Sequence, residues 1–228
     1  MKRKMIPGLL LAGWLLAAAA GGDVFERQKQ EDRFTPYWHQ RAGHFLKLPD
    51  TRDEIIFLGD SITDGGNWTE MFADLRVKNR GISGDVTAGV LARLDEVTQS
   101  QPLKIFLMIG INDLADGIKP EKVVENIQVI VKKIRLKSPK TRVYLESLLP
   151  VNPDLGMFPS HTKKSEEVLT VNARLEKLAE KFGLTYIDLF SRFVTSDGKL
   201  NPRLTNDGLH LTGEGYIVWK EAVEKYIR

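Results

Sequence analysis

A serine, an aspartate and a histidine stand at positions where together they could cleave an ester. Ser61 lies in the tetrapeptide Gly-Asp-Ser-Ile of residues 59–62, directly after the apolar run 54–58. A serine hydroxyl becomes a nucleophile only when a base takes its proton and a third group orients that base. Far downstream, Asp207 stands three residues before His210. The chain therefore contains a candidate nucleophile, orienting carboxylate and base, which predicts acyl transfer to water.

Two glycine-containing turns supply candidate donors for the negative charge that develops in such a reaction. They are residues 79–85 and 110–113, and each follows a predicted strand. In an open parallel sheet the strand exits lie at one edge, where ligands bind. Gly84 can present its backbone N–H without a Cβ in the way, and Asn112 can offer its side-chain amide. With the Ser61 N–H, these groups would give three donors for one oxyanion.

Strands and helices that would position these residues alternate along the chain from residue 54. Short apolar runs predict strands at 55–58, 77–79, 105–109, 143–149 and 184–190. Apolar residues at a spacing near 3.6 predict helices at 86–98, 120–136, 165–182 and 212–227. The strand-like runs are nearly continuous, as expected for strands covered on both faces. This alternation predicts an α/β protein with three layers, α/β/α, and a five-stranded parallel sheet.

The irregular segment 149–161 follows the fourth predicted strand and should therefore lie beside the site. It contains three prolines and one glycine and ends at His161. We expect His161 to be a solvated loop residue, with contact to substrate as the less favoured alternative.

The first twenty residues predict an export signal. Lys2, Arg3 and Lys4 precede the uncharged, Leu- and Ala-rich run 5–20, which ends in small residues suited to cleavage. This run is shorter than the about 20 apolar residues that span a bilayer. We therefore expect an exported protein, periplasmic or extracellular, with no stable membrane span after cleavage. An uncleaved membrane tether is the alternative.

Composition narrows the classes of function. The whole chain carries a net charge of +3, but residues 1–20 hold three basic and no acidic groups, so the remainder is neutral (3 − 3 = 0). A nucleic-acid partner is therefore not expected. The chain has no cysteine, which excludes disulfides, thiolate metal sites and a cysteine nucleophile. No phosphate-binding glycine motif and no cluster with metal-ligand spacing is present, so we expect no cofactor and no metal.

Four sequence blocks resemble those of the GDSL/SGNH hydrolases, and they occur in the same order. The blocks are Gly59–Thr63, Gly81–Asp85, Gly110–Asp113 and Asp207–His210. The branch that looks most similar contains the platelet-activating-factor acetylhydrolase catalytic subunits and related bacterial acylhydrolases. One departure is Ile62, where the motif that names the family has leucine.

The resemblance implies a catalytic triad of Ser61, Asp207 and His210. It also implies an oxyanion hole formed by the backbone N–H groups of Ser61 and Gly84 and by the Asn112 side chain. The family fold is a flavodoxin-like sheet of five parallel strands, and its members use no cofactor. We expect residues 21–53 to form a helical segment that packs on a hydrolase domain at 54–228. A homodimer is possible, because this branch of the family includes dimers.

The function that we expect is a serine esterase that removes short acyl groups, acetyl first among them, from carbohydrates or small lipids. A lysophospholipase or thioesterase with a longer acyl pocket is the alternative among enzymes. A catalytically silent glycan-binding module is the alternative from another class, although the chain retains every catalytic block.

Overall fold

A parallel sheet of five strands forms the centre of residues 34–228, the part of the chain that the computed structural model describes. The strands are β1 (Ile55–Gly59), β2 (Val77–Gly81), β3 (Lys104–Met108), β4 (Arg142–Glu146) and β5 (Thr185–Ile187). Their order across the sheet is β2-β1-β3-β4-β5, and every neighbouring pair is parallel. This order is that of the flavodoxin-like folds, as predicted.

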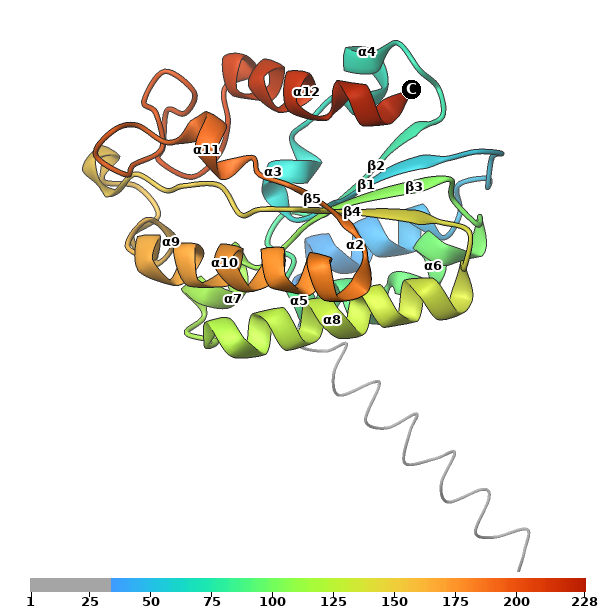
Figure 1. The fold of residues 1–228 in the computed structure, drawn as a ribbon. Coiled ribbons are helices and arrows are strands. Elements are labelled where there is room, and N and C mark those ends of the chain that lie inside the picture. The colour runs from blue at the N-terminus through green and yellow to red at the C-terminus, as the bar shows by residue number, and fades with distance from the viewer. Residues whose placement is uncertain (1–33) are drawn as a thin grey trace, which may run out of the picture. The chain divides into compact units, whose positions relative to one another are not determined.

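Helices cover both faces of the sheet (Figure 1). One face carries α2 (Pro36–Phe45), α5 (Thr87–Ala92), α6 (Leu94–Gln99), α8 (Pro120–Lys137) and α10 (Ser165–Phe182). The other face carries α4 (Trp68–Phe72), α11 (Phe190–Phe193) and α12 (Gly213–Ile227). Every residue of β1 and β3 is buried. The predicted three-layer α/β/α architecture is therefore confirmed.

The order of connection reverses between β1 and β3. From β1 the chain moves to the edge strand β2, and it then returns to β3 on the other side of β1. In doubly wound sheets ligands bind at such a switch point, beyond the carboxyl ends of the strands. The segments that leave β1 and β3, which contain Ser61 and Asn112, lie at this point.

The helix predicted at 86–98 is interrupted at Arg93, between α5 and α6. The Arg93 guanidinium pairs with Asp85 at 2.8 Å and donates to the carbonyl oxygens of Gly59 and Arg80, at 3.2 and 2.9 Å. These tertiary bonds hold Arg93 at the ends of β1 and β2, where the helix is interrupted.

The fourth and fifth strands are shorter than predicted. At their ends, hydrogen bonds from the backbone to side chains replace the backbone hydrogen bonds between neighbouring strands. After β4, the backbone N–H of Leu148 bonds the Asn172 side chain at 2.8 Å. The Ser147 hydroxyl accepts from the backbone N–H groups of Leu189 and Phe190, at 2.9 and 2.8 Å. The chain therefore leaves the sheet at the side where the site lies.

Of the predicted N-terminal segment 21–53, residues 21–33 lie outside the described residues, as does the predicted export signal 1–20. The remainder contains α2, and residues 36–228 cluster as one compact unit. Trp38 of α2 donates its indole N–H to Asp85 at 2.9 Å, and Tyr37 donates to Asp64 at 2.8 Å. No helix within residues 34–228 is long and apolar enough to cross a membrane.

Glu146, the last residue of β4, is a buried acid that the predicted chemistry does not use. Its carboxylate accepts from the Trp219 indole N–H of α12 at 2.8 Å. Burial raises the pKa of Glu146 to about 8, against a smaller lowering by the Trp219 bond. An unfolded glutamate ionises near pH 4.5. Between these values the folded state keeps a proton that the unfolded state releases, so this group lowers stability as pH rises.

Glu146→Gln is therefore expected to stabilise the protein at pH 8 and to leave its stability nearly unchanged at pH 4. The amide oxygen can still accept from Trp219 and carries no charge to bury. Thermal denaturation should show a rise in Tm of about 2–4 °C at pH 8 for each 1 kcal/mol gained. The exposed Glu180→Gln is the matched control. A Tm that falls equally at both pH values would contradict a protonation effect.

Candidate active site

Ser61 is the first residue of α3 (Ser61–Asp64), separated from the end of β1 only by Asp60, which caps the helix. The turn between strand and helix is tight because β1 ends in a glycine. A Cβ on Gly59 would lie 2.3 Å from the carbonyl oxygen of Met108 on β3, far inside contact distance. Only a residue without a side chain fits there, and the next turn of the chain presents Ser61 at the carboxyl edge of the sheet.

The side chains of the predicted triad are connected by hydrogen-bond contacts that run from Ser61 to His210 and from His210 to Asp207. His210 Nε2 is 3.0 Å from Ser61 Oγ, and His210 Nδ1 is 2.7 Å from Asp207 Oδ2. The other Asp207 oxygen accepts from the backbone N–H groups of Leu209 and His210, both at 2.8 Å. The short loop 207–210 therefore fixes both the Asp207 carboxylate and the His210 imidazole. The contact between His210 and Ser61 joins residues that are 149 positions apart in the sequence.

Electrostatics determine which nitrogen of His210 carries the proton. Burial by itself raises the pKa of Asp207, but the bonds from the Leu209 N–H and from His210 outweigh it, and the pKa lies below its usual value. An ionised carboxylate only accepts hydrogen bonds, so Nδ1 must carry its proton toward Asp207. In neutral His210 the lone pair of Nε2 is then directed at the Ser61 hydroxyl, as a general base requires.

The predicted oxyanion donors lie on the neighbouring loops. Gly84 has φ +78°, a backbone conformation that favours glycine, whereas a Cβ at this position would meet nothing within 4 Å. The backbone conformation, and not a lack of space for a side chain, therefore explains why glycine stands here. Asn112, the second residue of α7 (Ile111–Ala115), donates from Nδ2 to the carbonyl oxygen of Asp85 at 2.8 Å. Within residues 34–228, neither the Ser61 N–H nor the Gly84 N–H donates a hydrogen bond.

Two buried carboxylates tie the donor loops together. Asp85 accepts from Arg93 and Trp38, at 2.8 and 2.9 Å. Asp113 accepts from the backbone N–H and the hydroxyl of Thr87, at 2.9 and 2.5 Å. Since Asp85 follows Gly84 and Asp113 follows Asn112, each donor stands beside a residue whose side chain bonds a neighbouring helix or helix junction. The donors are therefore held before any substrate arrives.

His161 lies in the site, although the sequence favoured a solvated loop residue at this position. It lies on α9 (Pro159–Thr162) and is half-buried rather than solvated, with its Nε2 2.9 Å from Asn112 Oδ1. Its other nitrogen is 3.1 Å from the Ser160 hydroxyl. The position of the loop after the fourth strand was predicted, but the expectation of a solvated histidine was wrong. The contact depends on the path of the loop, for which the sequence holds no signal.

The same loop places an aromatic ring beside the triad. The ring of Phe158 meets that of His210 edge-on, with centroids 5.1 Å apart and an interplanar angle of 78°. A hydrogen bond of 2.9 Å from the Asn152 N–H to the Gly208 carbonyl joins this loop to the Asp207–His210 loop. Residues 150–161 therefore form one wall of the site.

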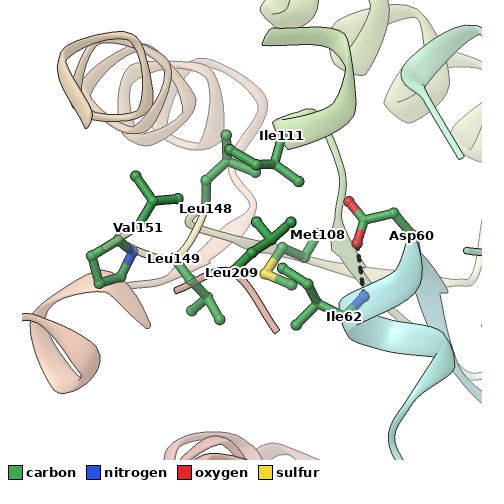
Figure 2. A pocket seen from close by; sticks show the side chains of 9 residues that line it. Asp60, Ile62, Met108, Ile111, Leu148, Leu149, Val151 and Leu209 are labelled. Carbon is green, nitrogen blue, oxygen red and sulfur yellow. Dashed lines mark hydrogen bonds between the residues drawn. The ribbon is translucent and has the colours of Figure 1, made fainter. Parts of the chain in front are cut away.

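A small pocket lies beside the site (Figure 2). Several residues that line it are adjacent in the sequence to Ser61, Asn112 or His210. Its labelled lining is mostly apolar: Asp60, Ile62, Met108, Ile111, Leu148, Leu149, Val151 and Leu209. The cavity volume is about 10 Å³, which is room for about one water molecule.

Asp60 is the polar side chain of this pocket. One oxygen accepts from the Ile62 N–H at 3.0 Å, and the other is buried without a hydrogen-bond partner among the described residues. Burial raises the pKa of Asp60 to about 7, against the lowering by the Ile62 bond. In the described part of the chain, no group of three His, Asp or Glu side chains is arranged to hold a metal ion.

The structure thus brings Ser61, His210 and Asp207 into hydrogen-bond contact at the switch point of the sheet. The sequence matches the GDSL-like lipase/acylhydrolase family over residues 57–218, and the chain belongs to that family. It is therefore an ester hydrolase, and the resemblance inferred from the four blocks is confirmed.

Individual relatives agree with this assignment. The human platelet-activating factor acetylhydrolase IB subunit alpha2 is 31% identical over 186 residues, which cover 78% of each chain. The structure of a GDSL-like lipase from Bacteroides thetaiotaomicron superposes with a TM-score of 0.73 at 25% identity, covering 83% of this chain and 96% of the other. The acetyl xylan esterase AlAXEase shares the fold, with a TM-score of 0.64 at 22% identity, covering 77% and 100% of the two chains.

Proposed function

We propose that this protein is a serine esterase that hydrolyses short-chain esters, acetyl esters above all, through an acyl-enzyme on Ser61. The observation that carries the proposal is the continuous contact from Ser61 Oγ through His210 to Asp207, with distances of 3.0 and 2.7 Å. Separations of about 2.6–3.2 Å are those at which a base takes a proton from its nucleophile.

In the first half-reaction Ser61 Oγ attacks the acyl carbonyl carbon while His210 Nε2 takes the hydroxyl proton. The carbonyl oxygen becomes an oxyanion. It accepts hydrogen bonds from the backbone N–H groups of Ser61 and Gly84 and from the side-chain amide of Asn112. Asp207 stabilises the imidazolium. The tetrahedral intermediate then expels the alcohol, which leaves with the proton held by His210.

In the second half-reaction water replaces the alcohol. His210 takes a proton from a water molecule as its oxygen attacks the acyl carbon on Ser61. Collapse of the second tetrahedral intermediate breaks the bond between the acyl carbon and Ser61 Oγ, and His210 returns the proton to that oxygen. The products are a carboxylic acid and free enzyme.

Similarity to a platelet-activating factor acetylhydrolase subunit, 31% identical over 186 residues, favours a short acyl group. A fold shared with an acetyl xylan esterase makes a carbohydrate a reasonable alcohol half, so that the substrate would be an acetylated carbohydrate ester. Such esters occur outside the cytoplasm, which is consistent with the export signal predicted at residues 1–20.

A second candidate, hydrolysis of a lipid-like ester with a longer chain, is favoured by one observation. The wall beside His210 exposes apolar side chains, with Leu155, Met157 and Phe158 at 37%, 49% and 38% exposure. These side chains could contact an apolar substrate that extends away from Ser61.

A series of p-nitrophenyl esters from acetate to octanoate distinguishes the two candidates. We expect kcat/KM to be highest for acetate and to fall by about tenfold or more by hexanoate, since a site complementary to an acetyl group must rearrange to accept a longer chain. A maximum at hexanoate or octanoate would support the lipid candidate instead. Absence of hydrolysis of every ester by folded protein would contradict both.

A further inference from the structure

The contact between His161 and Asn112 has only one consistent assignment of protons. The carbonyl oxygen of Asp85 can only accept, so the Asn112 atom 2.8 Å away must be the amide nitrogen. The amide oxygen then faces His161 Nε2 at 2.9 Å, and this nitrogen must carry a proton. In neutral His161 the bare Nδ1 can accept from the Ser160 hydroxyl at 3.1 Å.

These bonds leave one N–H of Asn112 for the substrate. The amide nitrogen has two hydrogens, and one of them is used by Asp85. The His161 N–H holds the amide oxygen, so the amide is fixed at both ends and cannot rotate about its last bond. The remaining N–H is therefore aimed by Asp85 and His161 together.

The histidine also makes that N–H a stronger donor. An N–H bound to the oxygen of an amide draws charge from its nitrogen, and linked hydrogen bonds of this kind strengthen one another. The gain is largest when the partner is charged, which is the state of the substrate oxygen in the transition state. Loss of His161 should therefore act on kcat more than on substrate binding.

The position of His161 is itself held. Helix α9 packs on α7, which carries Asn112, and the backbone N–H of His161 bonds the Phe158 carbonyl at 2.9 Å. Phe158 has φ +49°, a conformation that non-glycine residues adopt rarely and that starts the turn into α9. The loop thus delivers one imidazole to the donor side of the site and one aromatic ring to the base side.

We propose that His161 is a positioning residue of the esterase reaction, which orients and polarises the Asn112 amide toward the oxyanion. The proposal rests on the function proposed above. His161 does not touch the reacting atoms and acts through Asn112.

The test compares His161→Leu with His161→Gln, in the native sequence and in an Asn112→Ala background, on p-nitrophenyl acetate. His161→Leu should lower kcat by about tenfold with KM within about twofold, the loss expected for one hydrogen bond. His161→Gln, whose amide N–H can reach the same oxygen, should retain most of the activity. Asn112→Ala alone should lower kcat by about 10²–10³, and adding His161→Leu to it should lower kcat no further.

The matched control is His44→Leu, an exposed histidine on α2, which should leave kcat unchanged. If the His161→Leu variant does not fold, His161→Asn gives the same comparison, because its side chain is too short to reach Asn112. Equal losses for Gln and Leu, or additive losses with Asn112→Ala, would overturn the positioning role. A native enzyme without esterase activity would instead overturn the proposed function, so the two failures are distinguishable.

Discussion

Ser61→Ala is expected to lower kcat for p-nitrophenyl acetate by about 10⁴-fold or more. The methyl group cannot form the acyl-enzyme, and the oxyanion donors can then assist only direct attack by water. Ser61 is half-buried and its hydroxyl contacts His210. The variant should therefore fold with nearly the native Tm, and the loss should appear in steady-state rates at saturating ester.

The matched control for this variant is Ser191→Ala, an exposed serine on α11, which should hydrolyse the ester at the native rate. If Ser61→Ala kept more than about a tenth of the native kcat, another nucleophile would have to carry the reaction. The acyl-enzyme proposal would then be wrong even though the chain is an ester hydrolase.

Asp207→Asn is expected to lower kcat by about 10⁴-fold while leaving the loop in place. Its amide oxygen can still accept from the backbone N–H groups of Leu209 and His210. Its NH₂ group, however, would point at His210 Nδ1 and can only donate there. The imidazole proton would then be on Nε2, which could no longer accept from Ser61.

KM separates this effect from a general disturbance of the site. A wrong tautomer lowers kcat with little change in KM, since ester binding does not use Asp207. Asp188→Asn, an exposed aspartate between the buried Ile187 and Leu189, is the control and should leave kcat unchanged. If Asp207→Asn lost less than about tenfold in kcat, the orienting role of this carboxylate would be contradicted.

The parts of the fold that could be predicted are those governed by local patterns. The helix Ser165–Phe182 was predicted at both ends, because 18 residues of regular apolar spacing stop at Gly183, whose φ is +57°. The alternation of strands and helices was enough to predict a parallel three-layer sheet. The roles of Ser61, Asp207 and His210 could be predicted because four short blocks, each weak alone, occur together in the order of the family.

The remaining features depend on contacts between distant residues. Nothing near Arg93 in the sequence indicates that its guanidinium would bond Asp85 and the ends of two strands and so divide a helix. The contact of His161 with Asn112 joins residues 49 apart. Both features require the path of a loop over the carboxyl edge of the sheet, and local propensity does not determine that path.

The most direct test of the central claim is to identify the atom that reacts with an ester mimic. We would treat the protein with a p-nitrophenyl alkylphosphonate and locate the adduct by peptide mass spectrometry, with Ser61→Ala alongside. The account predicts one equivalent of released p-nitrophenol, one phosphonate on the peptide that contains Ser61, and no adduct in the variant. A folded protein that carries its adduct on another residue, or none at all, would contradict it.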